Sequence, residues 1–259
     1  MRIGILGAGQ LGRMLSQAAE KISLKSRIFS DQEGAPACLV AESIVVGDYT
    51  DEEKLKEFSA GCDVITYEFE NIPVETVRYI KKLKPVYPDE RLLEVSQDRL
   101  KEKSFLNKSG IPTARFAKAE SAKDVDKILD KWGKTSCILK TTRFGYDGKG
   151  QAFCRSKADI ERAFKTLKSR PLIAEEVVDF ECEISVIVCR DKTGKTAFYG
   201  PARNEHKHHI LSKTFAPGGL SPALTKKALT IAAKLAKAVN LRGVLALEMF
   251  VTKDGKILA

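Results

Sequence analysis

The segment from Lys140 to Gln151, KTTRFGYDGKGQ, combines three glycines with basic residues, a tyrosine and an aspartate. Glycine backbone can approach an oligophosphate closely, because it tolerates positive φ and has no Cβ to hold the anion away. Lys140 and Lys149 would supply countercharge. Apolar residues on both sides, 137–139 and 152–154, predict a hairpin whose loop covers phosphates. The alternative is an ordinary hairpin in which the glycines serve turn geometry alone.

Two carboxylates, Glu68 and Glu70, fall near the carboxyl end of a strand predicted at residues 63–69. Side chains two residues apart in a strand face the same side. Ligands of open α/β sheets bind at this edge, so Glu70 is a candidate for contacting a sugar hydroxyl. A solvated strand end followed by a helix cap is the alternative.

A third carboxylate, Glu248, lies at the centre of the apolar run 244–251, which predicts a strand with apolar residues on both faces. An unpaired buried carboxylate is strongly disfavoured unless a cation meets it. A divalent metal would resolve the conflict. A lysine or arginine from elsewhere in the chain is the alternative partner.

All three histidines lie in one segment, at positions 206, 208 and 209. His206 and His208 could share one strand face, which makes a zinc site conceivable. No cysteine or further acid stands nearby at a suitable spacing. Contact with a phosphate or a nucleotide is therefore the preferred interpretation.

The N-terminus reads as strand 2–6, then a turn with glycines at positions 7, 9 and 12, then a helix carrying Leu11, Met14, Leu15 and Ala18 on one face. Asp31 follows Gly12 by 19 residues, about where dinucleotide-binding folds keep a ribose-binding acid. An NAD site is therefore an alternative. The motif is weak alone, because such glycines serve the turn and the helix packing in any βαβ unit.

Alternating strands and helices predict a parallel sheet with helices on both faces up to about residue 96. A new helix begins near Gln97, with Asp98 as its N-cap. Beyond it, two helices frame the glycine hairpin in a small α+β lid, and further strands follow. The predicted fold is α/β and α+β, with domains at 1–96, 97–177 and 178–259.

The composition is that of a soluble globular protein, with 259 residues, 43% of them hydrophobic and 30% charged. No apolar run approaches the roughly 18 residues of a membrane helix, and no signal peptide opens the chain, so we expect a cytoplasmic protein without membrane partners. The net charge of +10 is scattered, which favours anionic small-molecule substrates over nucleic acid. The six cysteines form no CxxC pair and are expected to be reduced.

These motifs together resemble the ATP-grasp superfamily, and within it the family of 5-(carboxyamino)imidazole ribonucleotide synthases. They occur in the family's order along the whole chain. The matching segments are GAGQLGRM at 7–14, YEFEN at 67–71, QDRLKEKSFL at 97–106, LKTTRFGYDGKGQ at 139–151, EEVVDFECEISV at 175–186, NEHKHHIL at 204–211 and ALEMFV at 246–251.

The resemblance implies an N-terminal Rossmann-like pre-ATP-grasp domain followed by an ATP-grasp fold. It also implies an ATP-dependent ligase of purine biosynthesis that uses Mg²⁺ and forms a homodimer. In this reaction ATP phosphorylates bicarbonate to carboxyphosphate, which then carboxylates the exocyclic amine of 5-aminoimidazole ribonucleotide. Another ATP-grasp carboxylate-amine ligase and an NAD-dependent oxidoreductase are the alternative functions.

Roles in nucleotide binding follow from the resemblance by position. Arg99 and Lys140 would contact the nucleotide, Glu183 the ribose hydroxyls and His206 the phosphates, and Glu248 would hold Mg²⁺. The phosphates would be covered by Gly145, Tyr146, Asp147, Gly148, Lys149, Gly150 and Gln151. The adenine would be lined by main-chain groups of Glu175, Glu176, Val177 and Val178.

Roles toward the second substrate are implied in the same way. Tyr146, Asp147 and Lys149 would face the imidazole nucleotide as catalytic residues, and Asp147 would accept the amine proton. Gln10, Leu11 and Glu70 would complete that pocket, so that the first glycine motif would hold substrate rather than NAD.

Two departures from the family pattern stand out. Arg203 occupies a position where many relatives carry a glutamate before the asparagine. The family also continues, just past Ala259, with an asparagine and a glutamate that serves as second metal ligand. We therefore expect the sequence to be a fragment with a truncated C-terminal part, and these residues alone to be inactive.

Overall fold

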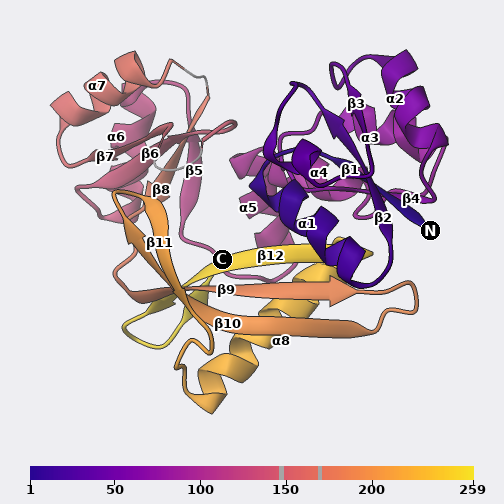
Figure 1. Cartoon of the computed structure of the whole chain (residues 1–259). Helices are drawn as coiled ribbons and strands as arrows, with labels where there is room; N and C mark the ends of the chain where they lie inside the picture. The colour runs from indigo at the N-terminus through magenta and orange to yellow at the C-terminus, as the bar shows by residue number, and fades with distance from the viewer. Residues whose placement is uncertain (146–148, 169–170) are drawn as a thin grey trace. The chain divides into compact units, whose positions relative to one another are not determined.

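The computed structural model describes residues 1–145, 149–168 and 171–259 (Figure 1). These residues divide into two compact units, Met1–Glu94 and Val95–Ala259. Among them, no helix combines the length and the apolar content that crossing a bilayer requires. All six cysteines are free thiols.

The first unit is built on a parallel four-stranded sheet in the order β3-β2-β1-β4, as the alternation of strands and helices predicts. Its strands are β1 (Arg2–Leu6), β2 (Lys25–Ser30), β3 (Ser43–Val46) and β4 (Val64–Tyr67). Its helices are α1 (Gln10–Lys21), η1 (Pro36–Leu39), α2 (Glu52–Ala60), α3 (Val74–Lys81) and α4 (Glu90–Ser96).

Successive strand residues enter two different cores, which shows that this sheet is covered on both faces. Ile5 of β1 packs in a cluster with Ala37 of η1. The next residue, Leu6, packs in a larger cluster with Phe58 of α2 and Ile80 of α3. Each fully buried side chain of this size contributes about 1.5–3 kcal/mol to the free energy of unfolding.

Helix α1 meets the sheet through small residues and leaves its large apolar ones outside. Gly12, Ser16 and Ala19 are buried, whereas Leu11 and Met14 are 57% and 55% exposed. The contact is too close for larger side chains, because a Cβ at Gly12 would lie 2.8 Å from the Gly7 carbonyl oxygen. The apolar face noted in the sequence is therefore the outer face of this helix.

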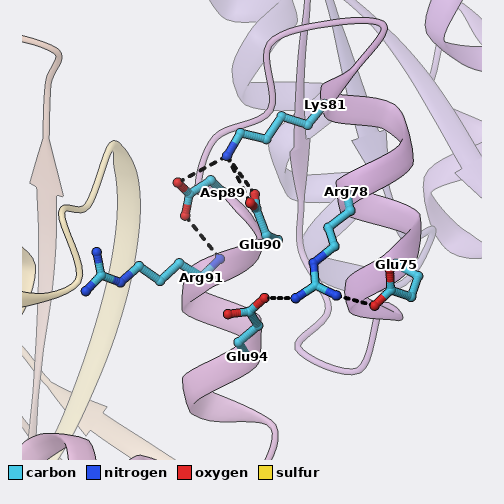
Figure 2. A network of polar contacts seen from close by, with 7 residues as sticks. All are labelled: Glu75, Arg78, Lys81, Asp89, Glu90, Arg91 and Glu94. Carbon is cyan, nitrogen blue, oxygen red and sulfur yellow. Dashed lines mark hydrogen bonds and ion pairs between the residues drawn. The ribbon is translucent and has the colours of Figure 1, made fainter.

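A network of ion pairs joins α3 to α4 on the surface of the first unit (Figure 2). Arg78 bridges Glu75 of its own helix and Glu94 of α4. One turn further along α3, Lys81 Nζ lies 2.8 Å from Glu90 Oε2 and 3.6 Å from Asp89 Oδ2. Exposed pairs of this kind each contribute at most about 1 kcal/mol to the free energy of unfolding. The network therefore matters more for the orientation of α3 and α4 than for the stability of the protein.

The second unit begins with a helix and an antiparallel sheet in the order β5-β8-β6-β7. Two predicted helices, α6 and α7, pack on it, and their residues Val125, Leu129 and Ile160 share a core with Leu139. The elements are α5 (Arg99–Lys108), β5 (Phe116–Ala119), α6 (Ala122–Trp132), β6 (Cys137–Thr141), β7 (Gln151–Cys154), α7 (Lys157–Thr166) and β8 (Leu172–Glu176).

The same unit continues in a five-stranded antiparallel sheet, β11-β10-β9-β12-β13, with α8 along one face (Figure 1). Helix α8 was not predicted. It buries Ala228, Ile231, Ala232, Leu235 and Ala236, and it packs on β9 and β10. The opposite face, here called the open face, carries exposed side chains such as Val244, Ala246 and Glu248. The elements are β9 (Phe180–Arg190), β10 (Thr196–Lys207), β11 (Ile210–Phe215), α8 (Pro222–Ala238), β12 (Gly243–Thr252) and β13 (Ile257–Leu258).

Candidate nucleotide-binding site

The glycine loop joins β6 to β7, which confirms the predicted hairpin. Lys140 and Gln151 are direct partners at its base, and the Thr141 N–H donates to the Gly150 carbonyl at 2.7 Å. Gly150 adopts φ +74°, and a Cβ there would lie 2.6 Å from Thr141 Oγ1. Turn geometry therefore demands this glycine. The predicted residues Tyr146, Asp147 and Gly148 lie outside the described residues.

The start of α5 holds the first half of this loop. Asp98 caps the helix by accepting from the backbone N–H groups of Leu100 and Lys101, as predicted. The Arg99 N–H donates to the Thr142 carbonyl at 2.9 Å, and Arg99 Nη2 donates to the Gly145 carbonyl at 3.1 Å. Arg99 thus brings a fixed positive charge to the mouth of the loop.

Behind the loop, the Glu175 carboxylate lies between two lysines. Lys140 Nζ donates to Glu175 Oε2 at 2.8 Å, and Lys103 Nζ lies 3.6 Å from Oε1. The side chains of Glu175, Lys140 and Lys103 are only 6%, 18% and 12% exposed. Burial raises the pKa of Glu175, but the two ammonium groups outweigh it and hold the pKa below its ordinary value.

Lys103 was missed in the sequence. Burial lowers its pKa from the ordinary value, and the nearby Glu175 opposes that effect. A signal was available, because Lys103 follows Arg99 by four residues on one helix, and such residues share a face.

Glu176 points to a different set of partners. Its Oε2 accepts from Arg115 Nε at 2.6 Å, and Lys134 Nζ lies 3.2 Å from its Oε1. The hydrogen bond from Arg115 is the main reason that the pKa of Glu176 falls to about 2. Strand β8 ends at Glu176, so Val177 and Val178 lie beyond the strand. The family resemblance implies that their main-chain groups line the adenine.

Glu248 is exposed, so the prediction of a buried carboxylate is wrong. Strand β12 alternates strictly, with Leu247, Met249 and Val251 in the core and Glu248 on the open face of the sheet. Glu248 stands opposite Ser185 of β9. The apolar run conceals this because its exposed positions carry small apolar residues such as Ala246.

Glu183 lies on the same open face, diagonally across from Glu248. His206 Nδ1 lies 2.9 Å from Glu183 Oε2. Burial raises the pKa of Glu183; the charge of Glu248 adds to this, whereas His206 and Lys140 oppose it. Lys140, at the base of the glycine hairpin, is therefore close enough to Glu183 to favour its charged form.

The donor set of this face fits a magnesium ion. Mg²⁺ takes oxygen ligands and is usually held by one or two carboxylates together with phosphate oxygens and water. Glu248 supplies an exposed carboxylate, and Glu183 brings a second one close to it. Within residues 1–145, 149–168 and 171–259, no three acidic, histidine or cysteine side chains converge as a metal site.

The three histidines do not share a strand face, so that interpretation is wrong for His206 and His208. Strand β10 ends at Lys207, and His208 and His209 occupy the turn with φ of 52° and 65°. His209, which sequence reasoning did not select, lies with its Nδ1 3.4 Å from Gln151 Nε2 at the base of the glycine hairpin.

A cavity of about 580 Å³ opens beside Glu183 and His206. This volume is within the range of pockets that hold small ligands. Its wall also includes the end of β10 and the glycines that precede α8. The lining residues are Phe180, Glu181, Cys182, Glu183, Arg203, Asn204, Glu205, His206, Lys207, Gly218, Gly219 and Leu220.

In the first unit, the N-terminal glycine motif encloses a carboxylate. The Gly9 N–H donates to Glu68 Oε1 at 3.0 Å, and burial raises the pKa of Glu68. Gly7 has φ +106°, and a Cβ there would lie 2.7 Å from the same oxygen. A dinucleotide pyrophosphate needs the amides of such a turn and would be repelled by this carboxylate, which argues against the NAD alternative.

The predicted shared face of Glu68 and Glu70 is also wrong. Strand β4 ends at Tyr67, so neither glutamate is in the strand. Glu68 is half-buried against the glycine turn, whereas Glu70 is exposed. Gln10 and Leu11, in the first turn of α1, are exposed as well.

Family models match both parts of the chain. The ribonucleotide synthetase preATP-grasp domain matches residues 1–97, and the ATP-grasp domain matches residues 104–259. The second match alone covers more than half of the sequence.

Individual relatives agree with these models. The N5-carboxyaminoimidazole ribonucleotide synthase of Brucella melitensis is 43% identical over 99% of this chain and 71% of its own length. An ADP complex of an N5-carboxyaminoimidazole ribonucleotide synthetase superposes with a TM-score of 0.93 at 36% identity, over 99% of this chain and 68% of that one.

A third relative carries both ligands. The Aspergillus clavatus N5-carboxyaminoimidazole synthase, solved with ADP and 5-aminoimidazole ribonucleotide, superposes with a TM-score of 0.90 at 27% identity, over 99% of this chain and 68% of that one. The chain therefore belongs to the N5-carboxyaminoimidazole ribonucleotide synthase family of ATP-grasp enzymes.

Proposed function

We propose that the protein is the ATP-dependent ligase that carboxylates the exocyclic amine of 5-aminoimidazole ribonucleotide in purine biosynthesis. ATP transfers its terminal phosphoryl group to bicarbonate, which yields ADP and carboxyphosphate. The substrate amine then attacks the carboxyl carbon, phosphate leaves, and the amine loses a proton. The strongest support is a cluster of three cationic side chains at the base of the glycine loop: Arg99, Lys140 and Lys103.

The side chains of the second unit would bind and orient the nucleotide. Lys140 and Arg99 would neutralise phosphate charge, and the amides of the loop would donate to phosphate oxygens. The carboxylate of Glu183 would accept hydrogen bonds from the ribose hydroxyls. His206, whose Nδ1 lies 2.9 Å from Glu183 Oε2, would stay close to the phosphates. Glu248 would hold a magnesium ion, which when bound neutralises the charge that develops during phosphoryl transfer.

The remaining assignments of the proposal rest on the resemblance. Asp147 would accept the amine proton, with Tyr146 and Lys149 beside it, and Gln10, Leu11 and Glu70 would complete the substrate pocket.

A homodimer is part of the proposal, as are the domain limits 1–96, 97–177 and 178–259. So is a cytoplasmic location, which is supported by six free thiols. The inactivity of residues 1–259 alone stays a prediction, testable by ADP release that depends on the aminoimidazole ribonucleotide.

ADP with Mg²⁺ should stabilise the chain against thermal unfolding, because a ligand of the native state raises the free energy of unfolding. At a hundred times the dissociation constant, the gain is about 2.7 kcal/mol. For a chain of this size that raises the melting temperature by roughly 5–10 °C. Scanning calorimetry with ADP and Mg²⁺, and separately with NAD, measures the effect.

NAD at the same concentration should leave the melting temperature unchanged, since Glu68 occupies the amide of the glycine turn. Stabilisation by NAD and not by ADP would reverse the assignment in favour of the oxidoreductase. If ADP and ATP both fail to shift the transition, the second unit is not a nucleotide site.

A further inference from the structure

Five charged side chains surround the base of the glycine hairpin, and they leave one positive charge in excess. Arg99 and Lys103 come from α5, Lys140 from β6, and the carboxylates from Glu102 of α5 and Glu175 of β8. Burial raises the pKa of the Glu102 carboxyl from its ordinary value, and the nearby Arg99 and Lys103 oppose that effect. Lys140 belongs to β6, the strand that leads into the loop.

We propose that Lys103 is a positioning residue for nucleotide binding: its charge beside Glu175 balances that carboxylate, so that Lys140, while hydrogen-bonded to Glu175, keeps a net attraction for phosphate. The inference rests on the proposed function, in which Lys140 meets the nucleotide. It concerns a residue that touches no phosphate itself.

The Glu175 carboxylate contacts both lysines. It lies 2.8 Å from Lys140 Nζ through Oε2, while Oε1 faces Lys103 at 3.6 Å. Without Lys103, a buried carboxylate and a single ammonium would form a neutral pair. Such a pair attracts an anion weakly, and its ammonium is held by the carboxylate rather than by the ligand. A second cation near the other oxygen gives the group a net positive charge, although Lys140 keeps its hydrogen bond to Glu175.

Titration separates this role from a merely structural one. Burial sets the pKa of Lys103 below that of a free lysine, so Lys103 loses its proton earlier than exposed lysines as the pH rises. Nucleotide affinity should then fall in the alkaline range. Stability of the unliganded protein should change in the opposite direction, because folding disfavours the charged form of a group whose pKa is lowered. A structural lysine would move stability alone.

The experiment compares Lys103→Met and Lys103→Arg with Lys101→Met, an exposed lysine of the same helix. Isothermal titration of the same chain with ADP and Mg²⁺ at neutral pH measures the dissociation constant directly, without any need for turnover. We expect Lys103→Met to weaken binding about tenfold, from loss of a unit charge close to Lys140 in a medium of intermediate dielectric. Lys103→Arg and Lys101→Met should bind like wild type.

The alkaline profile gives the second readout. Wild-type affinity should decline at alkaline pH, and the affinity of Lys103→Arg should decline less, because a guanidinium keeps its proton. Equal dissociation constants for wild type and Lys103→Met would overturn the inference and leave the proposed function standing. If Lys103→Met does not fold, identical pH profiles for wild type and Lys103→Arg would overturn it instead. Failure of the wild type to bind ADP would count against the proposed function itself.

Discussion

Replacing Glu248 by Gln should abolish the dependence of nucleotide affinity on Mg²⁺. In an active form of the enzyme it should also lower turnover by about a thousandfold, because a metal contributes several kcal/mol to stabilising the transferred phosphoryl group. The exposed position of Glu248 on the open face means that the amide meets no packing conflict. Burial is the main reason that the pKa of Glu183 is raised, and removing the charge of Glu248 relieves the repulsion that adds to it. Titration with ADP, with and without Mg²⁺, measures the first effect.

The matched control is Glu161→Gln, an exposed carboxylate on α7. It should retain the full effect of Mg²⁺. The melting temperature of unliganded Glu248→Gln should equal that of wild type or exceed it, so that a loss of function cannot be attributed to unfolding. A variant at position 248 that still gains affinity from Mg²⁺ as wild type does would remove Glu248 from the metal site.

Local patterns predicted the elements of this chain well wherever caps and periodicity were strong. The predicted hairpin around the glycine loop is present as β6 and β7, and Asp98 caps α5 as expected. Helix α8 and most of β10 were not predicted. The exposure of site residues on strands was predicted less well, because the alternation of side chains along a strand does not show which face of the sheet is exposed to solvent.

The errors have specific physical causes. Glu248 appeared buried because Ala246 and Val244, on the open face, are apolar too. The strand before Glu68 ends early because the chain turns to bring that carboxylate to the Gly9 amide, 59 residues away in sequence. Partners that far apart leave no local signal. Lys103, by contrast, could have been selected from its helical spacing to Arg99.

Replacing Glu175 by Ala should destabilise the protein by about 3 kcal/mol. Removing one member of a buried ion pair leaves its partner charged and uncompensated, which typically costs about 3–5 kcal/mol. Here two partners, Lys103 and Lys140, would be left facing each other with little solvent. Urea unfolding at neutral pH measures the loss. The adjacent Glu176→Ala is the control, since its pairs with Arg115 and Lys134 are more exposed and should cost about 1 kcal/mol or less.

The pH dependence of the same variant tests the cause. The pKa of Glu175 is lowered in the folded state, so its stabilising effect is present above the unfolded value of about 4.3 and is lost as the pH falls through the folded value. The Glu175→Ala variant should therefore lose less stability in acid than wild type does. Adding Lys103→Met to Glu175→Ala should recover part of the stability, because it removes one of two uncompensated charges. Strictly additive losses in that double variant would show that the lysines do not interact through Glu175.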